Sequence, residues 1–512
     1  MGKTFVPYTL DQRLLLPPDM RNWLPGGHLA LFVSDVVEKL DLKPIVGSYE
    51  EGDGRGQPPY HPQMMVKLLV YGYCTGKASS RKIERATYEE VAYRLLSGDQ
   101  HPDHDSIAHF RKRHLKALAG MFLEVLKLCQ KAGLVKLGHV ALDGTKVKAN
   151  ASKHKAMSYG RMEEAQKKLK EEVERLLREA QEIDEAEDRE YGKGRRGDEL
   201  PKELARRESR LRKIQEAKEA LEREAKEEAE RALQEAQAKI EERRRKEVES
   251  GKKIGGKKPQ IPQVEEAKPE AKAQRNFTDP DSRIMKDGAS KGFEQAYNAQ
   301  LAVDSESQII VAAAITQETN DKRQLVPMAQ KIKENMGVLP LWMSGDTGYF
   351  SESNVTDETL KGVDLYVPPD RLKHGAQEVE AKPSPEGTVT EEMRQKLRTE
   401  AGRGIYKMRK AIVEPVIGQI KEIRGFRRFL LRGLAQVEAE WLFICLTHNL
   451  LKLFRAAGGS CRGHEKIEKG RPGWMNLAMV EDFPTPFTSL ERLFGGLNNL
   501  IGLTKRIIPT GS

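Results

Sequence analysis

Apolar residues recur at helical spacing through the first quarter of the chain. The segments 61–76, 79–98 and 106–133 repeat apolar positions three and four residues apart and carry Ser or Gly near their ends. Several short helices of this kind, with Arg and Lys left on the outside, are typical of a small DNA-binding bundle. The pattern therefore predicts an all-helical N-terminal domain over residues 1–135.

A different pattern runs from about residue 155 to 250, where Glu, Lys, Arg and Ala dominate. Gly and Pro interrupt this stretch at 191–201, so it predicts a helical hairpin that projects from the protein. Its second arm would be about 45 residues and roughly 70 Å long. We expect a coiled-coil insertion over 153–275, ending in a flexible return linker at 251–275. The apolar residues spaced as a heptad seam are Met162, Ala165, Leu169, Val173, Leu176, Ala180 and Ile183, then Leu204, Leu211, Ile214, Leu221 and Ala225.

Short apolar runs bounded by turn residues lie on both sides of this insertion. Two of them, 294–304 and 307–317, are separated by a short polar turn and predict an antiparallel hairpin. With the insertion removed, the order of strands and helices predicts an α/β fold with a mixed sheet. The catalytic core would comprise 136–152 and 276–456, followed by a C-terminal tail at 457–512. The remaining predicted elements are strands within 137–152, 339–346 and 363–369 and a helix at 321–337 closed by Gly.

Composition narrows the class of partner. The formal charge of +10 fits a polyanionic partner such as DNA, although on 512 residues it is weak evidence by itself. Local clusters of Arg and Lys in the helical domain are more specific evidence for DNA binding than the net charge. The alternative for each of these residues is an ordinary position on a solvent-exposed helix face. The candidate phosphate contacts are Arg81, Lys82, Arg85, Arg111, Lys112 and Arg113.

Cysteine usage and hydropathy exclude other classes. The four cysteines form no CxxC pair, which supports neither a zinc ribbon nor a disulfide framework and favours a reducing, cytoplasmic setting. Cys461 and His464 are too few for a metal site. The apolar segment 441–454 is too short and too polar to span a bilayer, so we expect a soluble protein without a membrane partner.

Two aspartates follow apolar strands and are each followed by small residues. They are Asp143, in Asp-Gly-Thr, and Asp346, in Asp-Thr-Gly. Polar groups at strand ends of α/β sheets face the crevice where ligands bind, and small neighbours let a metal ion approach. The alternative is that each aspartate caps a turn. The presence of two in one predicted sheet favours the ligand interpretation.

A third acidic residue, Glu414, lies in the basic segment 402–433 at an otherwise apolar position. Lys410, Glu414 and Lys421 fall on one face of a helix, so a surface ion pair four residues apart is the alternative. Attack on a phosphodiester needs both the entering and the leaving oxygen stabilised, which two divalent ions held by carboxylates achieve. Asp143, Asp346 and Glu414 are therefore the candidate catalytic residues and metal ligands.

At these motifs the sequence resembles bacterial insertion-sequence transposases of the DDE class. The resemblance runs from about 55 to 455 and rests on DGTKVKAN around Asp143, YNAQLAVD at 297–304, ETNDKRQL at 318–325, GDTGY around Asp346 and VEPVIGQIK around Glu414. The segments HPQMMVKLLVYGY and DHDSIAHFRKRH resemble the helical domain of that group. The family signature Y-x2-R-x3-E-x6-K is matched with one departure, because four residues separate Arg409 from Glu414.

This resemblance implies a ribonuclease-H-like core that uses two Mg²⁺ or Mn²⁺ ions. The ions would be bound by Asp143 and Asp346, with Glu414 completing the site. It implies hydrolysis at the ends of the element to expose 3′-hydroxyls, which then attack target DNA. Two DNA ends must be held together, so we expect a homodimer or higher oligomer. The implied DNA contacts are Tyr406, Arg409, Lys410 and Lys421, besides Arg111 and Arg113.

Two other functions fit the same residues. One is a ribonuclease-H-like nuclease that cleaves without joining strands. The other is a catalytically inactive DNA-binding or scaffold protein whose coiled coil is its working part, against which the presence of all three carboxylates argues. The helical hairpin at 155–250 would mediate the pairing of the two DNA ends or reach flanking DNA. The alternative is that it is a tolerated projection without a function of its own.

Overall fold

The N-terminal region is helical, as predicted. The computed structural model describes residues 19–50, 58–191, 202–250, 261–286, 292–370 and 387–458. Local signals set the helix ends: the Asp103 side chain accepts a hydrogen bond from the backbone of Ser106, and Gly98 ends a helix in the left-handed conformation. The elements are η1 (Met20–Trp23), α1 (Leu29–Val37), α2 (Lys43–Glu50), α3 (Pro62–Cys74), α4 (Ser80–Glu89), α5 (Val91–Ser97), α6 (His104–Arg113) and α7 (Leu115–Lys131).

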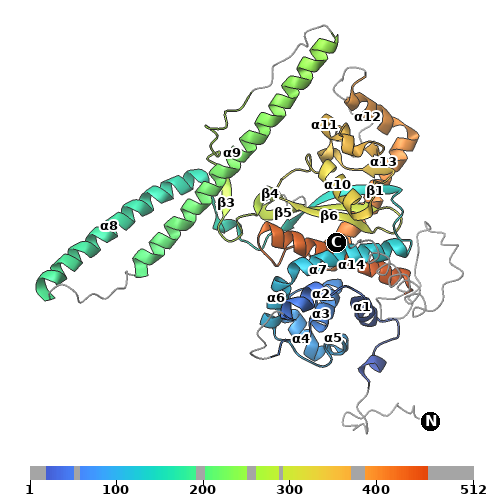
Figure 1. Ribbon diagram of the computed structural model, residues 1–512, viewed down its shortest axis with the longest axis horizontal. Coiled ribbons are helices and arrows are strands. Elements are labelled where there is room, and N and C mark those ends of the chain that lie inside the picture. The colour runs from blue at the N-terminus through green and yellow to red at the C-terminus, as the bar shows by residue number, and fades with distance from the viewer. Residues whose placement is uncertain are drawn as a thin grey trace, which may run out of the picture.

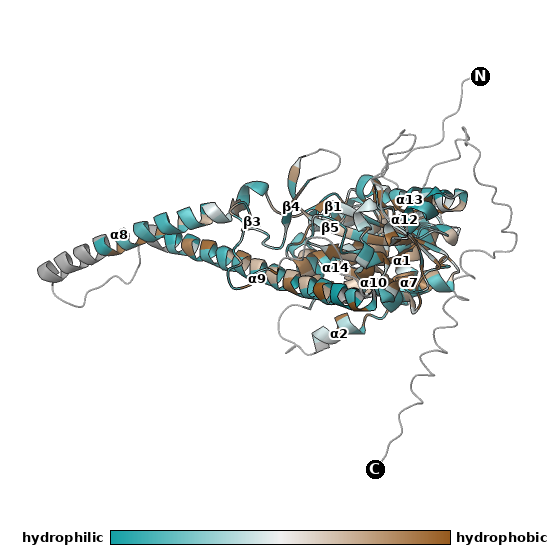
Figure 2. Ribbon diagram, turned by 90° about the horizontal axis from the view of Figure 1, so that it is seen from above, coloured by the Kyte–Doolittle hydropathy of each residue, from teal (hydrophilic) through white to brown (hydrophobic). Residues whose placement is uncertain are grey.

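These helices share a hydrophobic core with the sheet that follows. Helix α14 (Leu434–Ala456) packs along α7 and also touches α3. Tyr73 of α3 packs edge-on against Phe443 of α14, and both side chains are almost fully buried. One continuous cluster of buried residues runs from Leu29 to Phe454. Figure 1 shows α1–α7 gathered beside α14, and Figure 2 shows hydrophobic ribbon concentrated where α7, α10 and α14 meet.

A six-stranded mixed sheet forms the centre of the molecule. Its order is β4-β5-β1-β7-β8, and β6 also pairs with β5. β5 runs antiparallel to β1, β4 and β6, whereas β1, β7 and β8 are parallel. The predicted mixed α/β sheet and the predicted hairpin of β5 and β6 are therefore confirmed. The strands are β1 (His139–Lys148), β4 (Arg283–Lys286), β5 (Phe293–Asp304), β6 (Ile310–Thr316), β7 (Trp342–Ser344) and β8 (Asp364–Tyr366).

β1 is longer than its parallel neighbour β7 and continues past the end of their pairing. β7 pairs with β1 only as far as Ser344 opposite Ala141, whereas β1 continues to Lys148. Asp143 therefore lies in the part of β1 beyond its pairing with β7. Asp346 follows the end of β7 and caps the short helix η3 (Thr347–Tyr349) by accepting a hydrogen bond from the backbone of Gly348. The two parallel strands thus place both aspartates on the same side of the sheet, where β7 ends and β1 continues.

The insertion after β1 consists of two long helices, α8 (Tyr159–Tyr191) and α9 (Lys202–Ser250). Both ends of the insertion are held by a two-stranded ribbon of β2 (Ala156–Ser158) and β3 (Gln274–Asn276). The predicted seam packs at this base, where a small separate core is formed, while Leu177 further along α8 is 45% exposed. Figure 1 shows α8 and the first part of α9 projecting away from the sheet, while α9 continues past β3, where Glu235 pairs with Arg323 at 3.3 Å. The base core comprises Tyr159, Met162, Leu169, Ile214, Ala217 and Leu221.

Short elements complete the described chain. A predicted helix over 321–337 is observed as α10 (Leu325–Met336), which Gly337 closes with a φ of 80°. Cys74, Cys129 and Cys445 are buried thiols, while Cys461, His464 and the predicted tail from 459 onward lie outside the described residues. In the ranges that the structure covers, no helix has the length and apolar character needed to cross a bilayer. The other elements are η2 (Lys153–Lys155), α11 (Glu352–Val355), η4 (Glu358–Leu360), α12 (Val389–Arg398), α13 (Glu400–Gly418) and the π-helical turn η5 (Gln419–Ile423).

Candidate active site

Asp143 and Asp346 lie near enough for the charge of Asp346 to raise the pKa of Asp143. Burial raises the pKa of Asp143 to about 6, and the negative charge of Asp346 contributes to the rise. Burial likewise raises the pKa of Asp346, followed by the charge of Asp321. Asp143 lies within β1 and Asp346 follows the end of β7, and two neighbouring carboxylates with raised pKa values are typical of a functional site. The structure therefore brings together the two aspartates that the sequence singled out.

A buried arginine faces both aspartates. Arg409 of α13 places Nη1 3.5 Å from Oδ2 of Asp143, and its side chain is only 8% exposed. Its charge lowers the pKa of both aspartates and so opposes the effect of burial. The guanidinium also lies 5.9 Å from the ring of Tyr406, one helical turn earlier. Arg409 thus holds positive charge where a phosphate would meet the carboxylates, which fits its predicted role.

A third aspartate, Asp321, belongs to the same site and was not predicted. It lies in the loop between β6 and α10, and its Oδ1 accepts hydrogen bonds from Nδ2 of Asn298 and Nε2 of Gln300. Both amides are on β5, the strand beside β1. One sequence signal points to them, because Asn298 and Gln300 are alternate polar positions in an otherwise apolar strand and so share one face. Asp321 lies in a polar loop, and its one sequence signal is the ETNDKRQL motif, which contributed to the resemblance without marking this aspartate as a ligand.

Two polar atoms near these aspartates have no hydrogen-bond partner among the described residues. They are Nζ of Lys146 and Oδ1 of Asn298, on residues directly opposite each other in the pairing of β1 with β5. Burial lowers the pKa of Lys146, while the charges of Asp321, Asp346 and Asp143 act to raise it. A buried polar atom without a partner costs free energy. Both atoms are therefore poised to interact with a group that enters the site.

Glu414 lies on the outside of α13. Its side chain is exposed, while Arg409, Ile412 and Val413 of the same helix are buried. Arg409 and Glu414 point in different directions because they are five positions apart. Five residues turn an α-helix by about 500°, which leaves the two side chains about 140° apart around its axis. The assignment of Glu414 stays a prediction.

The two lysines predicted beside Glu414 have different surroundings. Nζ of Lys421 donates hydrogen bonds to Oγ1 of Thr145 at 3.0 Å and to the backbone oxygen of Lys146 at 2.9 Å. Lys421 therefore ties η5 to β1 two residues beyond Asp143. Lys410 is exposed on α13. Of these two lysines, Lys410 has the more exposed side chain.

The predicted basic surface of the helical domain is divided. Arg81, Lys82 and Arg85 are exposed on α4, and Arg85 pairs with Glu89 at 2.7 Å. The prediction places Arg111 on the DNA-facing surface, but the structure places it inside the domain. Its side chain is 7% exposed, and Nη1 donates to the backbone oxygen of Ala78 at 2.8 Å. Arg111 faces inward because that carbonyl and the Tyr73 hydroxyl accept its N–H groups there.

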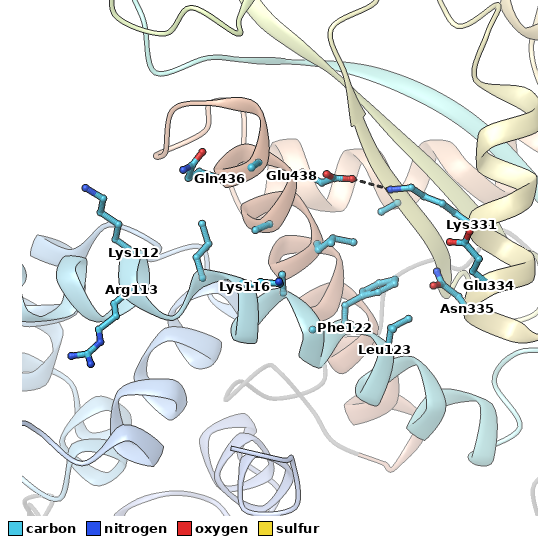
Figure 3. Close-up of a pocket in the computed structure, with 17 residues that line it drawn as sticks. Lys112, Arg113, Lys116, Phe122, Leu123, Lys331, Glu334, Asn335, Gln436 and Glu438 are labelled. Atoms are coloured by element: carbon cyan, nitrogen blue, oxygen red, sulfur yellow. Dashed lines mark hydrogen bonds and ion pairs between the residues drawn. The ribbon is translucent and has the colours of Figure 1, made fainter. Parts of the chain in front are cut away.

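Lys112 and Arg113 line a groove between the helical domain and the core. The groove has a volume of about 570 Å³ and is bounded by α7, α10 and α14. Figure 3 shows Lys112, Arg113 and Lys116 along one end and the ion pair of Lys331 with Glu438 toward the other, at 2.8 Å. Arg113 also donates to the backbone oxygen of Ser48. Figure 3 shows the side chains of the predicted contacts Lys112 and Arg113 pointing in opposite directions at this end of the groove.

The chemistry of the site suits a hard divalent cation. Within the described ranges, no group of three or more His, Cys, Asp or Glu side chains is already arranged to hold a metal ion. The donors near one another are nonetheless all oxygens: the carboxylates of Asp143, Asp321 and Asp346 and the unpartnered Oδ1 of Asn298. Carboxylate and amide oxygens are the ligands that Mg²⁺ and Mn²⁺ prefer. A divalent cation would also relieve the repulsion between these carboxylates.

Comparisons with known proteins agree with the class of protein that this site defines. Residues 18–113 match a family model described as a transposase domain (DUF772), and residues 371–454 match one described as a transposase DDE domain. The first match covers η1 to α6, and the second covers α12 to α14 with Arg409 and Glu414. Asp143, Asp321 and Asp346 lie between the two matches. Neither the curated proteins nor the solved structures contain a match to the chain.

The two matches support a DNA transposase and are consistent with an insertion-sequence transposase of the DDE class. Such domains imply DNA binding, and DDE transposases generally use divalent metal ions. The resemblance stated from the sequence motifs is therefore confirmed at the level of the family.

Proposed function

We propose that this transposase cleaves DNA at the ends of an insertion sequence and transfers the exposed strands into target DNA, using two divalent metal ions. The observation that carries this proposal is the meeting of Asp143 and Asp346 at one sheet edge, with the buried Arg409 beside them. Both carboxylates have raised pKa values, and a cationic partner would favour their charged forms.

The order of the strands supports a ribonuclease-H-like core. Three antiparallel strands, β6, β5 and β1, are followed by two parallel ones, β7 and β8. The first aspartate lies in β1 and the second follows β7, its parallel neighbour. Helix α13 crosses this sheet edge and carries Glu414. In this arrangement two catalytic residues come from the sheet and the third from the helix over its edge.

Each residue of the site would have its own role in the reaction. Asp143 and Asp346 would hold the metal ions, and Glu414 would complete the site after a rearrangement of α13 when DNA binds, because its side chain lies about 140° around the helix from Arg409. Arg409 and Lys410 would bind the phosphate and orient the scissile bond. Bound metal would supply stabilisation of the attacking and leaving oxygens. Lys421 would fix η5 against β1 and thereby hold α13 over the site.

DNA would approach across the basic residues of the helical domain, and pairing of two DNA ends would require a dimer. Lys112 and Arg113 of the groove in Figure 3 carry the charge for phosphate contacts. The long arm of α8 and α9 reaches far from the sheet and offers a surface for a second subunit or for flanking DNA.

Single substitutions test this assignment. Asp143→Ala, Asp346→Ala and Glu414→Ala should each abolish Mn²⁺-dependent cleavage of a DNA carrying the element's ends, while binding of that DNA persists in a mobility-shift assay. Glu358→Ala is the control, since Glu358 is an exposed carboxylate on η4. Glu422 and Glu400 are the next candidates for the third carboxylate if Glu414 fails this test. Full cleavage by the Glu414→Ala protein would refute the role of that residue.

Joining of strands is tested separately. Incubation of precut ends with a plasmid target should yield strand-transfer products. Cleavage without any such product would identify a nuclease of the same fold, and DNA binding without cleavage would identify an inactive DNA-binding protein.

A further inference from the structure

We propose that Asp321 is a further carboxylate of the metal-binding site, oriented by Asn298 and Gln300 so that one of its oxygens faces the space beside Asp346. This inference rests on the proposed metal-dependent function and adds a residue that lies outside the predicted triad.

The position of Asp321 is defined by two glycines that flank the other aspartates. A Cβ atom on Gly144, the residue after Asp143, would lie 2.5 Å from Oδ1 of Asp321. A Cβ atom on Gly348 would lie 3.6 Å from Oδ2 of Asp321 and 3.0 Å from Oδ1 of Asp346. Asp321 therefore lies on the face of β1 that Gly144 and Lys146 share, opposite to the face of the Asp143 side chain, and it extends to the loop that Asp346 caps. The absence of a side chain at Gly144 is what lets the carboxylate lie against β1.

A chain of hydrogen bonds fixes which way the carboxylate points. The hydroxyl of Tyr349 donates to Oε1 of Gln300, so Nε2 of that amide faces Asp321 and donates to Oδ1 at 2.6 Å. Nδ2 of Asn298 donates to the same Oδ1 at 2.7 Å and to the backbone oxygen of Glu318. Gln300 is therefore oriented by a donor and Asn298 by a second acceptor, and both amides donate to the same oxygen of Asp321. Oδ2 is the oxygen left for a ligand, and hydrogen-bonded support of this kind is typical of ligating carboxylates.

The unpartnered oxygen of Asn298 is an independent indication that a ligand belongs here. The Asn298 side chain is fully buried, and its Oδ1 has no hydrogen-bond partner among the described residues. This oxygen would lie 3.0 Å from a Cβ on Gly144, so it borders the same space as Asp321. A hydrated divalent cation bound by the carboxylates retains several waters, and such a water can donate to this oxygen.

Lys146 is consistent with the same interpretation. Its Nζ is buried without a partner among the described residues, and its charge interacts with Asp321, Asp346 and Asp143. In the absence of a metal ion, this ammonium is the nearby cation on β1 that offsets the three carboxylates. Binding of a divalent cation would take over that role.

Direct measurement of Mn²⁺ binding tests the inference without relying on activity. Free Mn²⁺ would be followed by electron paramagnetic resonance during titration of the full chain and of its Asp321→Asn and Gly144→Ala variants. We expect both substitutions to weaken Mn²⁺ binding at least tenfold. The first removes the charge of the carboxylate, whereas the second keeps every charge and displaces Asp321 by its Cβ. Glu358→Gln, an exposed carboxylate on η4, is the control and should bind Mn²⁺ as the wild type does.

Two further proteins make each outcome decisive. Asp143→Asn reports on the proposed function: if the wild type binds Mn²⁺ no more tightly than this variant, the metal site itself is refuted. If Asp143→Asn binds weakly while Asp321→Asn and Gly144→Ala bind like the wild type, only the role of Asp321 is overturned. Should either variant lose cooperative unfolding, Asp321→Glu replaces it, since it keeps the charge but moves the carboxylate. Wild-type affinity in Asp321→Glu would overturn the inference.

Discussion

The raised pKa of Asp143 predicts that its replacement by asparagine stabilises the metal-free protein at neutral pH. Asn keeps the size and shape of the side chain but removes the charge that is confined at the sheet edge. The side chain of Asp143 is only 21% exposed, and the nearby charges of Asp346 and Asp321 act against its ionisation. The site therefore stores unfavourable free energy when no cation is bound, as functional sites commonly do.

The size of the expected stabilisation follows from the pKa shift of Asp143. The pKa of Asp143 is raised from 3.8 to about 6 in the folded protein. Each unit is worth roughly 1.4 kcal/mol, so the ionised carboxylate costs up to about 3 kcal/mol of folding free energy at pH 7. As the pH falls through 6, the folded protein takes up the proton first and the cost shrinks. Below about 3.8 the carboxylate is protonated in both states, and this cost disappears.

Urea unfolding in the presence of EDTA measures this effect. Asp143→Asn should raise the free energy of unfolding by about 1–3 kcal/mol at pH 7.5 and by clearly less at pH 5. Glu358→Gln, the exposed control, should change it by less than about 0.5 kcal/mol at both pH values. A loss of stability in Asp143→Asn at pH 7.5, or an equal gain at both pH values, would refute the reasoning.

Two predictions concern parts of the fold that support the site. Gly76 has a φ of 77°, and a Cβ there would lie 2.6 Å from the backbone oxygen of Arg424, so Gly76→Ala should lower the free energy of unfolding by about 2–4 kcal/mol. The control Gly120→Ala, in α7 with open space around it, should leave the midpoint of urea unfolding unchanged or raised. Ile214→Asp should loosen the base of the arm, because Ile214 is 1% exposed in a core separate from the main one. Limited proteolysis should then cut within α8 and α9 faster, with the thermal midpoint of the main core unchanged. Leu177→Asp, at an exposed leucine, should be cut like the wild type, and equal rates for all three proteins would contradict this account.

The sheet and the two aspartates could be predicted because their signals are local. Short apolar runs before an Asp and a small residue mark buried strands. The prediction that the strand ends there is right for Asp346 but wrong for Asp143, because β1 continues to Lys148, paired with β5. The hairpin of β5 and β6 was likewise readable from two apolar runs around a polar turn, and its pairing is observed. Helix α10 ends at the predicted glycine, since only the local conformation decides that boundary.

Other features depend on contacts between distant segments and carry little local signal. Asp321 joins the site through amides on β5 and through the space left at Gly144, which no spacing along the chain reveals. Arg111 is indistinguishable in sequence from its exposed neighbours, yet the carbonyl of Ala78 holds it inside. The heptad seam continues along both arms in sequence, but the packing observed is at the base, where the β2–β3 ribbon brings the helices together.

The ribbon at the base of the arm has a consequence for how the chain folds. β1 and β5 must pair across an intervening segment of more than a hundred residues, and closing so long a loop is entropically costly. If α8 and α9 form first and the ribbon joins Ser158 to Gln274, the effective loop shortens about fivefold. That shortening lowers the closure cost by roughly 1.4 kcal/mol, equivalent to about tenfold in rate if closure limits folding. The insertion would then assist the pairing that it interrupts, and early formation of its helices would speed assembly of the central sheet.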